Sequence, residues 1–330
     1  MPNLLSGAGK NPLPPALLGQ DLWKVYGPVY ALRGVTIQVE QGEAVGLVGE
    51  TGSGKSSAAR ILCGLNRADR GDVSLDGTVV PRNAGIPKTF RKRVQMVFQD
   101  SSGSLDPRMA VRDILAEPLG NYAPGGAKKT REQVKRLLEA VGLDEGIGRR
   151  YPHEISGGQR QRVVIARALA PDPDYLVCDE PLSGLDAGTQ GLVLHALRRL
   201  GGRRGILFIS HDLACAARVS RRLYVMFAGR AVEHLRTEDI PSAAHPYTRA
   251  LFGCLFRALG TTGAPETKKG LGPGKTGADF GVPENGCPFR LQCPEPLSLC
   301  GENHPPARWV NASQNHWARC YRVKGGALPC

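Results

Sequence analysis

Short apolar runs, each bounded by glycine, proline or charged residues, recur along most of the chain. The clearest runs are rich in Val, Leu and Ile and lie at 43–48, 94–99, 175–180 and 205–210. Runs of this length and composition are typical of strands that are buried in a sheet. Alternating apolar residues predict another strand at 31–40, and the segment 71–77 predicts a strand that ends in an Asp-Gly turn.

Segments of helix-forming composition lie between these strands, at 57–65, 111–119, 130–141, 163–170 and 192–200. Strands that alternate with helices predict an α/β fold. From residue 100 to about 172 the pattern changes to helices, so we expect a helical subdomain there. We place the main domain at residues 20–255, with 1–18 as a mobile lead-in and 256–330 as a C-terminal extension.

A glycine-rich loop joins the predicted strand at 43–48 to the predicted helix at 57–65. It has the form G-x-x-x-x-G-K-[ST] and consists of Gly49, Glu50, Thr51, Gly52, Ser53, Gly54, Lys55 and Ser56. A strand, a glycine loop and a helix N-terminus in this order point backbone N–H groups at one spot, which favours a phosphate group. Lys55 would reach the β- and γ-phosphates, and the Ser56 hydroxyl would ligate Mg²⁺. A chance glycine-rich turn does not account for the flanking elements, so we predict that the chain binds a nucleoside triphosphate.

Polar residues stand at the C-terminal ends of three predicted strands. Asp179 and Glu180 end the strand at 175–180. Gln99 ends the strand at 94–99, and His211 directly follows the strand at 205–210. Asp179 would hold Mg²⁺ through its water shell, and Glu180 would polarise an attacking water. Ligands of open α/β sheets bind outside such strand ends, which favours function over a surface carboxylate pair, a turn glutamine or a structural histidine.

A second glycine-containing loop precedes the predicted helix at 163–170 and holds Ser156, Gly157, Gly158 and Gln159. It is a second potential anion site at a helix N-terminus, but it carries no lysine and follows no strand. One complete and one incomplete phosphate site in a single chain suggest that the sites are assembled between two chains. Upstream of the first loop, Tyr26 could stack on an adenine ring, although its spacing alone favours an ordinary half-buried strand tyrosine.

The 330 residues carry a net charge of +13. A basic surface can meet nucleic acid or the anionic cytoplasmic leaflet, or it can be solvated without a partner. The charges are scattered and not interleaved with aromatic residues, so we favour membrane proximity or no partner over nucleic acid. No apolar run is long enough to span a bilayer, and the first residues do not resemble a secretion signal, so we expect a cytosolic protein.

Taken together, these motifs resemble the nucleotide-binding subunit of an ATP-binding-cassette (ABC) transporter over residues 22–255. The matching parts appear in family order. Tyr26 matches the A-loop, Gly49 to Ser56 with the following Ser57 match Walker A, and Gln99 matches the Q-loop. Residues 155–159 match the signature, Asp179 and Glu180 match Walker B, 183–186 match the D-loop, and His211 matches the switch histidine. The departures are small: Ile155 replaces the usual Leu, Ser57 the commoner Thr, and 181–184 reads Pro-Leu-Ser-Gly.

This resemblance implies a P-loop NTPase with a mixed sheet core and a helical subdomain, acting as an ATPase. It implies that two such domains pair head-to-tail and bind ATP between Walker A of one and the signature of the other. Mg²⁺ would be held through Ser56, Gln99 and Asp179, with Glu180 orienting water and His211 contacting the γ-phosphate. The partner's Ser156 to Gln159 would close the site.

Two stretches resemble the peptide and nickel importers of this family, namely 97–108 and 245–251. The resemblance implies a second, non-identical ATPase subunit, transmembrane permease subunits that contact a groove at 100–122, and indirectly an extracytoplasmic solute-binding protein. It places the chain at the cytoplasmic face of the inner membrane as a peripheral protein. The alternative is a soluble ABC-type ATPase acting on nucleic acid or ribosomes, which the net charge and the cysteines described next would suit.

Four cysteines lie in the C-terminal extension after a linker-like segment at 261–283: Cys287, Cys293, Cys300 and Cys320. In a cytosolic chain, such a group favours metal over disulfides, but zinc sites usually show tighter C-x₂₋₄-C pairs. The segment resembles the C-terminal motif of peptide-importer ATPases, which can hold a [4Fe–4S] cluster; zinc and unmetallated thiols are the alternatives. We expect Cys63, Cys178 and Cys215 to pack in the core, and assign no role to Cys254 and Cys330.

Overall fold

The computed structural model describes residues 14–81, 85–99, 103–122, 124–200, 202–258 and 286–328. The predicted linker at 261–283 and Cys330 lie outside these residues, and so does most of the predicted lead-in. Residues 16–18 of that lead-in belong to the first strand, because Leu17 is buried between the two sheets described below.

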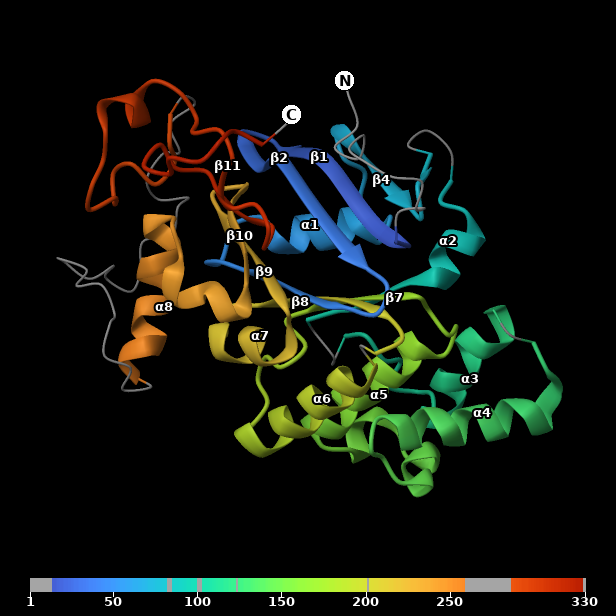
Figure 1. The fold of residues 1–330 in the computed structure, drawn as a ribbon. Coiled ribbons are helices and arrows are strands. Elements are labelled where there is room, and N and C mark those ends of the chain that lie inside the picture. The colour runs from blue at the N-terminus through green and yellow to red at the C-terminus, as the bar shows by residue number, and fades with distance from the viewer. Residues whose placement is uncertain are drawn as a thin grey trace.

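An eight-stranded mixed sheet forms the centre of the fold (Figure 1). In spatial order its strands are β11 (Arg308–Asn311), β12 (His316–Ala318), β10 (Arg230–Arg236), β9 (Arg222–Phe227), β3 (Ala44–Val48), β8 (Gly205–Ser210), β7 (Tyr175–Asp179) and β6 (Val94–Val97). The five strands from β9 to β6 are parallel, and β10, β12 and β11 are added antiparallel. The apolar runs predicted as buried strands are β3, β6, β7 and β8.

A smaller antiparallel sheet covers one face of this sheet, and α1 (Lys55–Leu62) lies between the two (Figure 1). The strands of this smaller sheet, in spatial order, are β2 (Val29–Glu40), β1 (Ala16–Tyr26), β4 (Arg70–Leu75) and β5 (Thr78–Val79). Asp76 and Gly77 both have positive φ in the turn between β4 and β5, as an Asp-Gly hairpin turn requires. Alternate residues of the central strands, such as Val177 and Cys178 of β7, pack into the separate apolar clusters on the two faces.

Helices pack on the other face of the central sheet, except α2 (Lys88–Arg93), whose buried Phe90 belongs to the cluster around α1. The bounds of the remaining helices are α3 (Val111–Tyr122), α4 (Gly126–Ala140), α5 (Gly157–Leu169), α6 (Ala187–Leu200), α7 (Leu213–Val219) and α8 (Pro246–Ala258). The helices within residues 100–172, where the sequence predicts a helical subdomain, are called the helical part below. Helices α4 and α6 begin earlier than predicted because their first turns are polar and exposed, so that the apolar periodicity starts later. Asp186 stabilises the start of α6 by accepting hydrogen bonds from the backbone N–H and the hydroxyl of Thr189.

The C-terminal residues 286–328 are joined to the central sheet through β12, which pairs with β10. Glu233 of β10 is 0% exposed, and its carboxylate accepts hydrogen bonds from the backbone N–H groups of Ala244 (2.6 Å) and His245 (3.0 Å). The same carboxylate lies 2.8 Å from Nε2 of His316 in β12. One buried side chain therefore ties together β10, the entry to α8 and the C-terminal segment. Cys63, Cys178 and Cys215 are buried elsewhere in the core, as expected.

We predict that Glu233→Ala lowers the free energy of unfolding by about 3 kcal/mol, because the N–H groups of Ala244 and His245 and the buried ring of His316 lose their shared partner. The measurement is the shift of the urea unfolding curve. Glu238→Ala is the control: Glu238 is an exposed carboxylate paired with Arg236, and its loss should cost less than about 0.5 kcal/mol. Equal shifts for the two variants would contradict the role of Glu233.

Candidate nucleotide site

The loop between β3 and α1 passes two other backbones at close range. Gly49 and Gly54 both have positive φ (148° and 102°). A Cβ atom at Gly49 would lie 2.2 Å from the carbonyl oxygen of Met226, and one at Gly54 would lie 2.2 Å from that of Ala31. Only glycine satisfies both the conformation and the space, which explains these two positions of the motif in physical terms.

Lys55 at the start of α1 is buried, with 5% of its surface exposed. Its ammonium group donates hydrogen bonds to the carbonyl oxygens of Gly49 (2.8 Å) and Glu50 (2.7 Å). Desolvation lowers the pKa of Lys55, and the nearby carboxylates of Glu180, Asp179 and Glu50 act in the opposite direction. A cation held at this depth is a strong partner for a phosphate group.

The three residues predicted to hold Mg²⁺ come together. The Ser56 hydroxyl donates to Oδ1 of Asp179 at 3.2 Å. Ser56, Gln99 and Asp179 also line one pocket with a volume of about 490 Å³. Burial raises the pKa of Asp179, although the Ser56 hydrogen bond and the charges of Arg60 and Lys55 oppose this shift. A hydroxyl, an amide and a carboxylate are suitable oxygen ligands, directly or through water, for Mg²⁺.

Glu180 and His211 are also brought together. Glu180 follows β7, and its carboxylate lies 2.8 Å from Nδ1 of His211, which follows the neighbouring strand β8. The backbone of Glu180 has φ 47°, an unfavourable conformation for this residue type that is typical of functional sites. The carboxylate is mostly buried, whereas the imidazole is exposed. A buried acid beside an accessible histidine, next to a phosphate loop, has the parts needed to orient a water molecule.

The second glycine loop lies at the N-terminus of α5, and its residues are not among those that line this pocket. Ser156 caps the helix: its hydroxyl accepts from the Gln159 N–H (3.2 Å), while the Gln159 side chain accepts from the Ser156 N–H (3.0 Å). Ser156 and Gly157 are exposed, but Gly158 packs against Thr189 of α6. The exposed part of the loop is therefore available to another molecule.

Tyr26 lies at the end of β1, outside the pocket, and 44% of its surface is exposed. Its hydroxyl accepts a hydrogen bond from Asn66, and the Lys24 ammonium lies 5.4 Å from the ring centre. Ser57 follows Ser56 within α1 and is half-buried.

One functional contact was not predicted. The Tyr247 hydroxyl, in the first turn of α8, accepts a hydrogen bond from the backbone N–H of Glu50 in the phosphate loop, at 3.1 Å. The sequence marked 245–251 as a family-like stretch but gave no signal of this contact, because the two residues are far apart in the chain.

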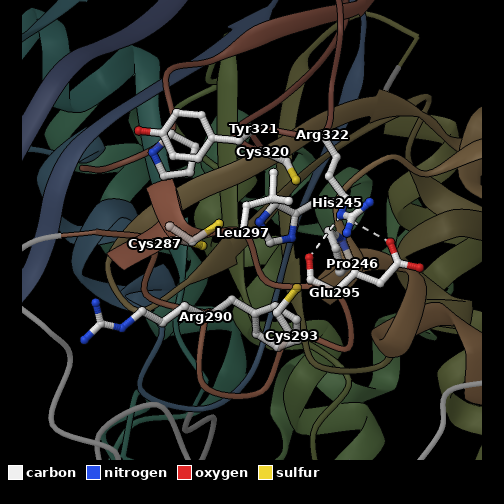
Figure 2. Close-up of a pocket in the computed structure, with 13 residues that line it drawn as sticks. His245, Pro246, Cys287, Arg290, Cys293, Glu295, Leu297, Cys320, Tyr321 and Arg322 are labelled. Atoms are coloured by element: carbon white, nitrogen blue, oxygen red, sulfur yellow. Dashed lines mark hydrogen bonds and ion pairs between the residues drawn. The ribbon is translucent and has the colours of Figure 1, made fainter. Parts of the chain in front are cut away.

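The four predicted cysteines line one cavity in the C-terminal segment. Figure 2 shows Cys287, Cys293 and Cys320 around His245, which lies directly before α8. Burial raises the pKa of Cys287 to about 11 and also raises the pKa of Cys293 and Cys320. Within the part of the chain that the structure describes, no three His, Cys, Asp or Glu side chains are close enough to hold a single metal ion.

Comparison with known proteins gives a consistent result. The sequence pattern described as ABC transporter matches residues 32–183. The chain is 39% identical to the putative oligopeptide transport ATP-binding protein YkfD of Bacillus subtilis (strain 168), over 89% of this chain and 90% of that protein. It is 37% identical to the oligopeptide transport ATP-binding protein OppF of Escherichia coli (strain K12), over 92% of this chain and 91% of that protein.

Among solved structures, the dimeric bacterial ABC transporter cassette MJ0796 superposes with a TM-score of 0.60 at 27% identity, covering 67% of this chain and 98% of that chain. A second structure of MJ0796, in a post-hydrolysis state with ADP and Pi, gives a TM-score of 0.61 at the same identity and coverage. None of the helices in the described ranges is both long and apolar enough to cross a membrane. The sequence likeness extends over most of the chain, and the protein belongs to the ATP-binding subunits of the ABC transporter family and is an ABC-type ATPase.

Proposed function

We propose that the chain is the energy-coupling subunit of a membrane importer for peptides or a related small solute, such as a nickel chelate. The observation that carries this proposal is the likeness to OppF and YkfD over about nine tenths of the chain. The arrangement of the candidate catalytic groups supports it, since Ser56 contacts Asp179, Glu180 contacts His211, and both carboxylates lie near Lys55.

In the proposed mechanism, Lys55 exchanges the carbonyl oxygens of its own loop for the β- and γ-phosphates of ATP. Mg²⁺ held through Ser56, Asp179 and Gln99 would neutralise charge on the phosphates. Glu180 orients the attacking water, and His211, at hydrogen-bond distance from Glu180, contacts the γ-phosphate. Glu50, Thr51, Gly52, Ser53 and Gly54 surround the phosphates, with Ser57 beside them, and Tyr26 stacks on the adenine.

A second ATPase subunit completes the site in this proposal. Ser156 and Gly157 are exposed at the N-terminus of α5, where backbone N–H groups and the helix dipole favour a phosphate. With Gly158 and Gln159 they would close over ATP bound to Walker A of the partner. The dimeric state of the MJ0796 cassette supports pairing of this kind. We propose a paralogue as partner, so that the two subunits form a heterodimer.

The permease would dock in a groove of about 260 Å³ between the central sheet and the helical part. Residues from β6, α3, α5 and the segment between β6 and α3 line it: Gln95, Met96, Phe98, Ser104, Glu117, Pro118, Asn121, Tyr122, Val164, Arg167 and Ala168. Phe98, Ser104 and Arg167 also line the nucleotide pocket, so a helix seated in the groove would be in contact with the ATP site. In this proposal the chain is a peripheral protein at the cytoplasmic face of the inner membrane, a solute-binding protein acts indirectly, and no nucleic acid is a partner.

We further propose that the four cysteines hold a [4Fe–4S] cluster as a structural element. Four thiols that line one cavity suit this cluster, in which each cysteine binds a different iron. A single zinc ion would draw thiolate sulfurs to about 2.3 Å from one centre, and the described side chains are not grouped so closely. Metal binding would also favour the thiolate forms over the protonated forms that burial favours.

We predict that Glu180→Gln lowers ATP turnover of the assembled complex by at least about 100-fold, because the water loses its base, while the Kd for ATP stays similar. Phosphate release measures turnover, and a fluorescent nucleotide measures binding. Glu139→Gln, an exposed change on α4, is the control and should leave turnover intact. Unchanged turnover in Glu180→Gln would contradict the assignment.

The transport role is tested by co-purification with membranes that contain the permease subunits. Tyr122→Ala in the groove should reduce the amount of chain that co-purifies with these membranes at least about threefold, because one aromatic contact with the permease is lost. Tyr30→Ala is the matched control, because Tyr30 lies in the antiparallel sheet and, like Tyr122, has a basic side chain over its ring. Stimulation of turnover by RNA or DNA, with no membrane association, would instead support the soluble ATPase.

The cluster is tested by anaerobic purification with iron and sulfide assays. We expect about four irons and four sulfides per chain in the wild type and their loss in Cys293→Ser, because one ligand is removed. Cys330→Ser, a cysteine outside the four, is the control. Zinc in place of iron would overturn the cluster in favour of the alternative metal, and the absence of both metals would overturn the metal site.

A further inference from the structure

Tyr247 connects the phosphate loop to α8. Its side chain is 0% exposed, and its hydroxyl accepts the hydrogen bond from the Glu50 N–H described above. Glu50 is the second residue of the loop, directly after Gly49. The contact therefore fixes the point at which the chain leaves β3 and enters the phosphate-binding turn.

The other polar group of the Glu50 backbone has a different partner. Its carbonyl oxygen accepts a hydrogen bond from Lys55, at 2.7 Å. When Lys55 turns toward a phosphate group, this carbonyl loses its cation, whereas the bond to Tyr247 does not depend on Lys55. Tyr247 can thus hold the loop in the same place before and after the nucleotide binds.

The Tyr247 side chain packs against β9 and against the C-terminal segment. Its ring lies with centroids 4.6 Å from Phe227, at the end of β9, and 5.5 Å from Phe289. Its backbone N–H donates to Nδ1 of His245 at 3.1 Å, and the His245 ring lies 5.9 Å from Phe289. Phe289 is fully buried, and both it and His245 line the cavity of the four cysteines. Phe289 therefore packs against the Tyr247 ring and also forms part of the wall of the cysteine cavity.

We propose that Tyr247 is a positioning residue for the phosphate loop and that the four-cysteine segment holds it in place through Phe289 and His245. The packing of this segment and the affinity for nucleotide are then coupled. Because such coupling is reciprocal, a bound nucleotide also stabilises the cysteine cavity. The proposal depends on nucleotide binding and on these side chains, not on the transported solute or on the identity of the metal.

The first test is the Kd of the full chain for Mg-ADP, measured by calorimetry. Tyr247→Phe keeps the ring but leaves the Glu50 N–H without its acceptor, and we expect the Kd to rise about three- to tenfold. Tyr224→Phe is the matched control, because the buried Tyr224 hydroxyl accepts a backbone N–H in the same way, from Gln38 on β2. Its Kd should stay within about twofold of wild type. Equal Kd values for Tyr247→Phe and Tyr224→Phe would overturn the role of Tyr247.

The second test addresses the link to the cysteine segment. Phe289→Leu keeps all four cysteines but removes the aromatic wall, and it should also raise the Kd for Mg-ADP at least about threefold. Phe90→Leu, at a buried position in α2, controls for the loss of a core ring. An unchanged Kd in Phe289→Leu would overturn the link.

A third measurement does not require the Phe289 variant to fold. The rate at which a thiol reagent modifies the cysteines of the C-terminal segment is followed with and without Mg-ADP, using mass spectrometry to identify the sites. We expect Mg-ADP to slow modification several-fold in the wild type and to have no effect in Tyr247→Phe. Equal rates in the wild type with and without Mg-ADP would overturn the coupling.

Discussion

The nucleotide site depends on how closely the loop between β3 and α1 approaches its neighbours. Gly49 passes the carbonyl of Met226 and Gly54 passes that of Ala31 at distances that leave no room for a side chain. Between these two points, the Gly229 N–H donates to the Ser53 carbonyl and the Tyr247 hydroxyl accepts from Glu50. The loop is thus fixed by β2, by the turn after β9 and by α8. Its backbone N–H groups are arranged for phosphate before any ligand arrives, which reduces the entropy lost on binding.

The carboxyl ends of β3, β6, β7 and β8 bring together residues from four separate parts of the chain. Asp179 and Glu180 at the end of β7 lie close to Lys55 of the loop. Phe98, directly after β6, lines both the nucleotide pocket and the groove beside α3. The nucleotide pocket and the surface of the helical part are therefore separated only by a few shared side chains. This arrangement suits a two-state switch that is biased by the γ-phosphate.

Much of this site could be predicted from the sequence because its signals are local. The phosphate loop, the carboxylates after β7 and the histidine after β8 each follow an apolar run within a few residues, and parallel strands bring such ends together. The contacts of Tyr247 and Glu233 could not be predicted in this way. Each joins segments that are distant in the chain, and neither residue type nor spacing identifies its partner. The early starts of α4 and α6 were missed because polar first turns carry no periodic signal.

The pairing of β12 with β10 has a further consequence for the outer margin of the central sheet. Without residues 286–328, the seven-residue strand β10 would present its unpaired N–H and C=O groups as a template for strands of other molecules. With them, β12 pairs with Glu233 and His234 in the middle of β10, and the outermost strand is the four-residue β11, which is a shorter template. The C-terminal segment thus shields the middle of the β10 edge, and its removal would expose backbone groups that favour strand pairing between molecules.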